Sequence, residues 1–230
     1  MRESDALVVM ITGATGPLGH AATARFMRDG ASLVLVGTNR GRLAALADAT
    51  GLEPARHMLV EADLRQRDAA RGAAEQATDR FGRIDVLLHA VGGFVSGTAV
   101  ADLDVDEVRR MLDQHLWTTL NTVQAVLPGM LQSGFGRVLA VSSPLASNPG
   151  AKGASYAVAK SAEEVLLRSL ARETAGTGVT ANLLVVRTIA TGQGDPPSAT
   201  PPEHLAEVLA YLASPGARSV TGQRIVVGGA

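Results

Sequence analysis

Residues 6–28, A-L-V-V-M-I-T-G-A-T-G-P-L-G-H-A-A-T-A-R-F-M-R, decide the fold class of this chain. The first seven residues form a short apolar run of the kind found in a central parallel strand, and the residues after Gly19 read as a helix. Glycines between them let the backbone approach a pyrophosphate, which the N–H groups and dipole of the helix attract. The stretch predicts a dinucleotide-binding loop formed by Gly13, Thr15, Gly16, Leu18 and Gly19.

The alternation of apolar runs and helical segments continues to the end of the chain. Further strands are expected within residues 32–37, 57–62, 83–93, 138–143, 179–186 and 221–230. Strands that are repeatedly followed by helices predict an α/β fold with a central parallel sheet. Because nothing in the composition marks a linker, residues 1–230 are expected to form a single doubly wound domain.

The composition excludes several classes of function. The net charge is −1 and acidic and basic residues are interspersed, so neither nucleic acid nor a membrane surface is an expected partner. The N-terminal apolar run is too short for a signal or transmembrane helix, and the cytoplasm is the expected location. The chain has no Cys, which excludes disulfides and thiolate chemistry. No metal site is expected, because the five histidines lack ligand spacing: His20, His57, His89, His115 and His204.

A hydroxyl, a phenol and an amine are grouped between residues 143 and 160. Tyr156 and Lys160 are four residues apart in a segment that reads as a helix, so they share one helix face. The lysine cation favours the phenolate, which makes Tyr156 a candidate general acid or base. Ser143 ends a buried apolar run, at the edge where open α/β sheets bind ligands. A surface pair and a strand-end cap are the alternative, but the chain has only two Tyr and two Lys, and Arg is its usual surface cation.

These residues and their spacing resemble the Ser…Tyr-x-x-x-Lys site of the short-chain dehydrogenase/reductase family, and the similarity extends over nearly the whole chain. The resemblance implies a Rossmann-type fold with a seven-stranded sheet in the order 3-2-1-4-5-6-7. It also implies that Ser143 holds a substrate carbonyl and Tyr156 protonates it. Lys160 would lower the pKa of the tyrosine and bind the nicotinamide ribose. Homodimers or homotetramers that pack through helices 118–133 and 154–175 are expected on the same ground.

The residues after the second strand indicate which nicotinamide cofactor binds. An acidic residue at this position would bind the ribose hydroxyls and repel a 2′-phosphate, but the chain has Thr38, Asn39 and Arg40. NADP(H) is therefore favoured over NAD(H), although Arg40 could equally be a surface residue at a helix start. Asp63-Leu64 resembles the family's pair beside the adenine. The alternative for Asp63 is an N-cap of a helix over 65–81.

Several positions depart from the family's pattern. Pro17 stands where the loop usually has glycine, which is tolerable in a first helical turn. His89 and Ala90 replace the two asparagines of N-N-A-G, while Ala90, Val91 and Gly92 are still expected beside the cofactor. Val186-Arg187 replaces the usual Pro-Gly, and the following Ile189 and Thr191 resemble residues that contact the nicotinamide carboxamide and the phosphates. Residues 192–202 are rich in Pro and Gly, which predicts a short lid without a stable helix.

His115 occupies the place of the family's catalytic asparagine, in a helical pattern from Val105 to Ser133 that is broken near Trp117. The family's asparagine serves a proton-relay water through its backbone carbonyl, which any residue but proline supplies equally. His115 is therefore a candidate catalytic residue, either through this carbonyl or as a group that titrates near pH 6.5.

The function expected from the sequence is NADP(H)-dependent reduction of a ketone, or the reverse oxidation of a secondary alcohol. The substrate is expected to be a small carbonyl or alcohol compound. Two alternatives remain open. The chain could be a binding or regulatory protein that keeps the fold without turnover, or a non-redox enzyme such as a cyclase, dehydratase or epimerase.

Overall fold

The structure, a computed structural model, describes residues 6–192 and 194–228. Its centre is a parallel sheet of seven strands in the order β3-β2-β1-β4-β5-β6-β7. The strands are β1 Val8–Thr12, β2 Ser32–Gly37, β3 His57–Glu61, β4 Val86–His89, β5 Gly136–Ser142, β6 Val179–Val185 and β7 Arg224–Val226. The order reverses between β1 and β4, so loops that leave these strands in opposite directions open a crevice. The predicted doubly wound fold and its strand order are confirmed.

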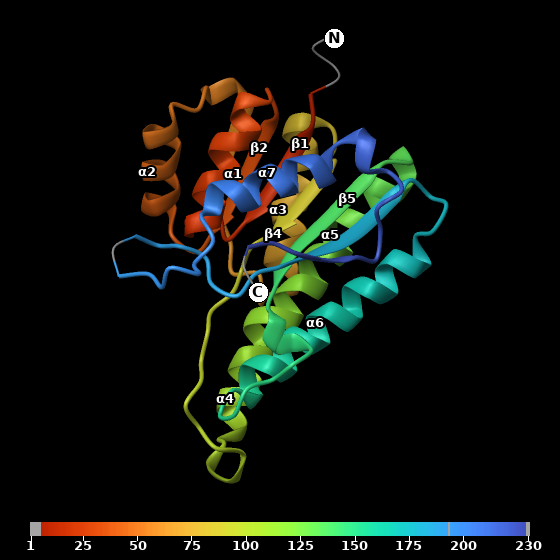
Figure 1. Cartoon of the computed structure of the whole chain (residues 1–230). Coiled ribbons are helices and arrows are strands. Elements are labelled where there is room, and N and C mark those ends of the chain that lie inside the picture. The colour runs from red at the N-terminus through yellow and green to blue at the C-terminus, as the bar shows by residue number, and fades with distance from the viewer. Residues whose placement is uncertain (1–5, 193, 229–230) are drawn as a thin grey trace.

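Helices cover both faces of the sheet (Figure 1). One face carries α1 Pro17–Arg28, α2 Arg40–Thr50 and α7 Pro202–Ala213; the other carries α3 Arg67–Phe81, α5 Thr118–Ser133 and α6 Ala154–Glu173. Among the described residues, short 3-10 helices lie in loops at Pro54–Arg56, Val100–Asp102, Pro144–Ala146 and Pro215–Ala217. None of the helices in the part of the chain that the structure describes has the length and apolar character needed to cross a membrane.

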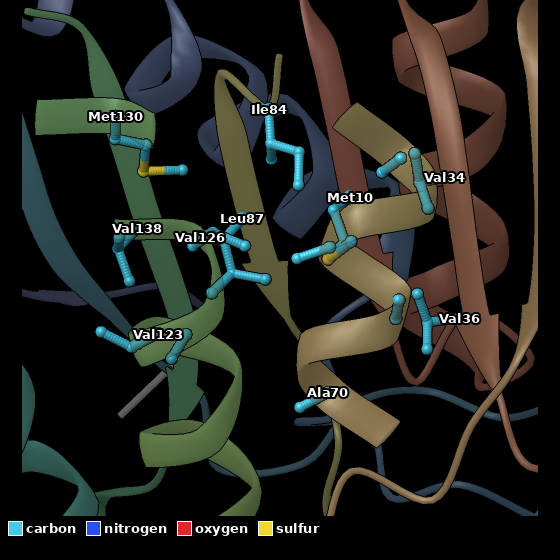
Figure 2. Close-up of a cluster of buried hydrophobic side chains, with 14 of the residues drawn as sticks. Met10, Val34, Val36, Ala70, Ile84, Leu87, Val123, Val126, Met130 and Val138 are labelled. Carbon is cyan, nitrogen blue, oxygen red and sulfur yellow. The ribbon is translucent and has the colours of Figure 1, made fainter. Parts of the chain in front are cut away.

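The two layers follow from the alternation of side chains along buried strands. In β1, Val8 and Met10 face the cluster under α3, α5 and α6, whereas Val9 and Ile11 face the cluster under α1, α2 and α7. Figure 2 shows Met10 beside Val34 of β2 in the first cluster. Because both faces are covered, the central strands β1, β2 and β4 are almost entirely apolar, as the sequence predicts.

The helical pattern from 105 to 133 is interrupted, as expected. The chain forms α4 Val105–Leu112, then a π-helical turn η4 Asp113–Trp117, and then α5. The π turn rotates the following helix relative to α4, and such turns recur at functional sites. Figure 1 shows α4 and the first turns of α6 beyond the carboxyl edge of the sheet. The described residues of 192–202 contain no helix before α7 begins at Pro202, in agreement with the expected short lid.

Candidate active site

The glycine loop runs directly against the end of β4. Gly13 has φ +68°, and a Cβ there would lie 2.6 Å from the carbonyl oxygen of Ala90. Both the backbone conformation and the close approach require glycine at this position. Pro17 is the first residue of α1, where its missing N–H costs nothing, so the unusual proline leaves the helix start intact. The loop therefore presents the N-terminus of α1 to the crevice as predicted.

A cavity of about 580 Å³ opens at the carboxyl edge of the sheet. Nine of the predicted cofactor residues line it: Gly13, Thr15, Gly16, Thr38, Asp63, Leu64, Ala90, Val91 and Gly92. The other eight lie outside this lining: Leu18 and Gly19 pack inside α1, Asn39 and Arg40 begin α2, Tyr156 and Lys160 lie on α6, and Ile189 and Thr191 follow β6. The volume, the glycine walls and the helix N-terminus fit the adenosine and phosphate part of a dinucleotide.

Arginines that the sequence did not single out also line this cavity. They are Arg42 of α2, Arg65 after β3 and Arg110 of α4. Arg42 donates a hydrogen bond to the carbonyl oxygen of Thr15 at 3.1 Å, which holds its guanidinium beside the glycine loop. Arg40 instead donates to the carbonyl oxygen of Leu59 at 2.9 Å, on the flank of the sheet. Both arginines lie in the first turn of α2, which begins at residue 40, so the sequence carries no signal that distinguishes them.

Asp63 forms a turn rather than a helix cap. Its carboxylate accepts hydrogen bonds from the backbone N–H of Arg65 at 3.1 Å and from the guanidinium of Arg65 at 2.8 Å. The Arg65 guanidinium holds the pKa of Asp63 below its usual value, so the carboxylate is ionised beside the cavity. The helix that follows begins at Arg67 with Gln66 at its N-cap, and the alternative of Asp63 as N-cap is wrong.

His89 links three elements behind the site. Its Nδ1 lies 2.9 Å from Thr12 Oγ1 of β1, and its Nε2 lies 3.2 Å from Thr118 Oγ1 of α5. Burial lowers the pKa of His89 to about 3, and the charge of Lys160 adds to this effect. The neutral imidazole can donate to one threonine and accept from the other. It thus supplies the sheet-to-helix connection for which the family uses asparagine.

The predicted catalytic side chains are held at the end of β5. Ser143 Oγ accepts the N–H of Leu145 at 3.3 Å, so its own proton remains available to a substrate oxygen. Ser161 Oγ donates to the carbonyl oxygen of Ala146 at 2.5 Å and ties α6 to the segment that carries Ser143. Tyr156 is contacted edge-on by the rings of Phe94 and His115, with centroid distances of 5.0 and 5.5 Å. These contacts fix the phenol ring without engaging its hydroxyl.

Lys160 is buried and has two protein acceptors. Its Nζ donates to the carbonyl oxygen of Val141 at 2.7 Å and to Glu163 Oε2 at 2.7 Å. Glu163 is fully buried and is not among the site residues predicted from the sequence. The spacing was the available signal, since Glu163 lies three residues after Lys160 in the predicted helix and therefore on the same face.

His115 lies in the π-helical turn η4 and is fully buried. Its Nε2 is 3.0 Å from the carbonyl oxygen of Gly93, whereas its Nδ1 has no hydrogen-bond partner among the described residues. Burial lowers the pKa of His115 to about 3, again with a contribution from Lys160. The backbone carbonyl of His115 accepts the N–H of Thr118 and lies 2.6 Å from the hydroxyl of Thr119. At neutral pH the imidazole of His115 is therefore uncharged, and its backbone carbonyl already has hydrogen-bonding groups of the protein beside it.

The chain after β6 closes on itself. The predicted cofactor contact Thr191 donates its N–H and its hydroxyl to the carboxylate of Asp195. Ile189 packs against the α1, α2 and α7 side of the core and forms a bridge with Thr200. Backbone hydrogen bonds of Gly192 and Thr191 lower the pKa of Asp195. The carboxylate of Asp195 thus accepts the hydrogen bonds of Thr191 that, by the family resemblance, would go to a cofactor phosphate.

Comparison with known proteins identifies the family. Residues 7–199 match the family described as short chain dehydrogenase. A (2S)-[(R)-hydroxy(phenyl)methyl]succinyl-CoA dehydrogenase subunit BbsC from Thauera aromatica is 32% identical over 246 aligned positions, covering 98% of this chain and 94% of the relative. An uncharacterized oxidoreductase from Staphylococcus epidermidis is 31% identical over 172 positions, covering 75% of this chain and 73% of that protein. The solved structure of a short chain dehydrogenase from Bacillus anthracis has the same fold, with a TM-score of 0.88 at 24% identity and coverage of 98% and 95%. The chain therefore belongs to the short-chain dehydrogenase/reductase family of nicotinamide-dependent oxidoreductases.

Proposed function

We propose that this protein interconverts a ketone and a secondary alcohol with NADP(H), using Tyr156 as general acid or base. The observation that carries the proposal is the attachment of α6 to the end of β5. The bond from Lys160 to the carbonyl of Val141 holds the helix of Tyr156 beside the strand end of Ser143, at the edge where the cavity opens. The relative from Thauera aromatica is named as dehydrogenase of a compound with a hydroxy(phenyl)methyl group, which is a secondary alcohol.

The side chains divide the work on the substrate oxygen. When bound, a nicotinamide cofactor would provide the hydride for the carbonyl carbon, or take it up in the reverse direction. Ser143 donates a hydrogen bond to the carbonyl oxygen, and this bond strengthens as negative charge develops there. Tyr156 transfers its phenolic proton to the same oxygen, and the neighbouring ammonium of Lys160 favours the phenolate that remains. In the oxidation direction, Tyr156 takes the proton from the alcohol.

The choice of NADP(H) rests on charge at the end of β2. The cavity wall there contains Thr38 and Arg42, and Arg42 is held by Thr15 in the glycine loop. A 2′-phosphate carries negative charge and acceptor oxygens, which a guanidinium binds with charge-assisted hydrogen bonds. Arg42 is in this respect the better candidate than Arg40, whose guanidinium is engaged with Leu59.

The experiment that tests the function compares Tyr156→Phe with the matched control Tyr211→Phe. Tyr211 is the other tyrosine of the chain and is 57% exposed on α7. With ketone substrates and NADPH, we expect Tyr156→Phe to lower turnover by about 10²- to 10⁴-fold at unchanged NADPH affinity. The control is expected to match the wild type. Reduction at a normal rate by Tyr156→Phe would refute the proposed role, and substrate conversion without a change in NADPH absorbance would favour a non-redox reaction.

A second candidate is a cofactor-binding subunit with little turnover of its own. The observation that favours it is the ion pair between Lys160 and Glu163, because a carboxylate next to the ammonium weakens its effect on Tyr156. The relative from Thauera aromatica is itself named as a subunit. Binding of NADPH without its consumption, tested over a panel of ketones and alcohols, would support this candidate.

We also propose that the chain assembles as a homodimer or homotetramer. Helices α5 and α6 expose Leu131, Val158 and Val165, which are 42%, 50% and 57% accessible. Apolar side chains exposed along two helices are suited to helix–helix packing between copies. Light scattering of the purified protein measures the assembly directly, and a monomer at micromolar concentration would refute the proposal.

A further inference from the structure

Glu163 lies at the centre of a buried polar chain behind the predicted catalytic pair. One carboxylate oxygen accepts Lys160 Nζ at 2.7 Å, and the other lies 3.0 Å from the hydroxyl of Thr119. The hydroxyl of Thr119 lies in turn 2.6 Å from the carbonyl oxygen of His115. The chain therefore joins α6 to the π-helical turn through the side chains of Glu163 and Thr119.

The negative charge of Glu163 lies directly beside the positive charge of Lys160. Both side chains are at most 5% exposed, so solvent screens their interaction weakly. A cation near a phenol favours the phenolate, and an anion bound to that cation offsets the effect. Two of the three ammonium donors have protein acceptors in the described chain, at Val141 and at Glu163, and these fix the position of the ammonium.

We propose that Glu163 is a positioning residue that holds the ammonium of Lys160 and sets how strongly its charge acts on Tyr156. The proposal rests on the proposed function in that Tyr156 and Lys160 are taken as its catalytic pair. Glu163, like Tyr156 and Lys160, lies outside the cavity lining, and it acts through Lys160, from the side of the helix that bonds to Thr119 of α5.

Thr119 allows Glu163 to be held in either protonation state. A hydroxyl carries one proton, so Thr119 donates either to Glu163 or to the carbonyl of His115. The carboxylate form of Glu163 accepts from Thr119, and the acid form can donate to it. Burial raises the pKa of Glu163, against the opposing influence of Lys160 and Thr119. The other titratable groups around the pair are Tyr156 and Glu164 on α6, His115 in η4 and His89 on β4.

The test measures ionisation of Tyr156 without depending on catalysis. The chain contains two tyrosines, so the alkaline titration of tyrosinate absorbance is compared with that of Tyr156→Phe, which retains only the exposed Tyr211, and the difference gives the transition of Tyr156. Glu163 follows Tyr156 by seven residues, about 10 Å along the helix axis. Loss of a unit charge at that distance corresponds to a shift of about one pH unit. We therefore expect Glu163→Gln to move the Tyr156 midpoint down by about one unit and to leave that of Tyr211 in place.

The matched control is Glu164→Gln, which removes the neighbouring buried carboxylate. Glu164 binds Arg224 at 2.7 Å and Ser142 at 2.6 Å instead of Lys160, and the side chain of Arg224 is 29% exposed to screening solvent. A smaller shift of Tyr156 is expected. If Glu163→Gln does not fold, Glu163→Leu removes the same charge without burying an amide.

An unchanged Tyr156 midpoint in a folded Glu163 variant, or an equal shift in Glu164→Gln, would overturn the proposal. The same variants are assayed for the pH dependence of alcohol oxidation, where the inflection is expected to move in the same direction. A shifted absorbance titration in a protein that never consumes NADP(H) would refute the proposed function and leave the role of Glu163 standing.

Discussion

Replacement of His89 by asparagine tests whether this buried imidazole makes the protein sensitive to acid. His89 is 1% exposed, and burial lowers its pKa from the ordinary 6.5 to about 3. In the unfolded chain His89 therefore binds a proton below about pH 6.5, whereas in the folded chain it binds one only below about pH 3. Stability from this group is fully present above pH 6.5 and is lost as the pH falls through the window from 6.5 to about 3.

The magnitude at pH 5 follows from the unfolded state, because pH 5 lies well above the folded pKa. It is about 1.5 units below the ordinary histidine value, and at 1.36 kcal/mol per unit the loss is about 2 kcal/mol. An asparagine side chain at this position has no proton to gain, and its amide ends near the position of the imidazole Nδ1, which faces Thr12. We therefore expect the fall in unfolding free energy between pH 7 and pH 5 to be smaller in His89→Asn than in the wild type by about 2 kcal/mol.

Urea denaturation at the two pH values, followed by circular dichroism, measures this difference. All other titrating groups are common to both proteins and cancel in the comparison. His204→Asn, at the exposed start of α7, is the matched control and is expected to behave as the wild type. An equal loss of stability on acidification in His89→Asn and the wild type would refute the reasoning.

Two further predictions concern the cofactor and the pH profile. Arg42→Ala is expected to weaken NADPH binding by about 10- to 100-fold, as for loss of a charge-assisted hydrogen bond, with a much smaller effect on NADH binding. Calorimetric titration of both cofactors measures the change, with Arg40→Ala as the comparison. Equal losses of affinity for the two cofactors would contradict a role of Arg42 at the 2′-phosphate. His115 has a pKa of about 3 and is therefore neutral above about pH 4. The profile of kcat against pH is accordingly expected to keep its shape in His115→Asn. An inflection near pH 6.5 that only the wild type shows would contradict this prediction.

Most of the fold could be predicted from the sequence because strand burial and helix starts are local signals. The apolar run over residues 6–12 and the helical residues after Gly19 place β1 and α1 to within a few residues of their observed starts at Val8 and Pro17. The strand order, in contrast, came from family resemblance, since periodicity alone does not say which strands are neighbours. The start of α3 was placed two residues early, because Asp63 bonds to Arg65 in a turn that leaves the helix start to Gln66.

The site was less predictable, because it depends on which partners the guanidinium and carboxylate groups contact in the folded chain. Arg40 and Arg42 are equivalent in a sequence, and only the folded chain shows one bound to Leu59 and the other to Thr15. Glu163 follows Lys160 at helical spacing, which in most helices describes a solvated pair. Its burial comes from the packing of α6 against α4 and the π-helical turn η4 and from its hydrogen bond with Thr119, and no local pattern reports these contacts.

The unusual residues of this chain act on one another through Lys160. His89 and His115 stand where the family has asparagines, and each has its pKa lowered by burial and then by the charge of Lys160. A protonated imidazole near that ammonium would be repelled, so the lysine helps to keep both histidines neutral. Glu163 offsets this repulsion by binding the same ammonium. The departures from the family pattern are thus coupled. His89 and His115 stay neutral near the buried ammonium of Lys160, and the carboxylate of Glu163, which offsets the charge of Lys160, also limits the effect of that charge on Tyr156.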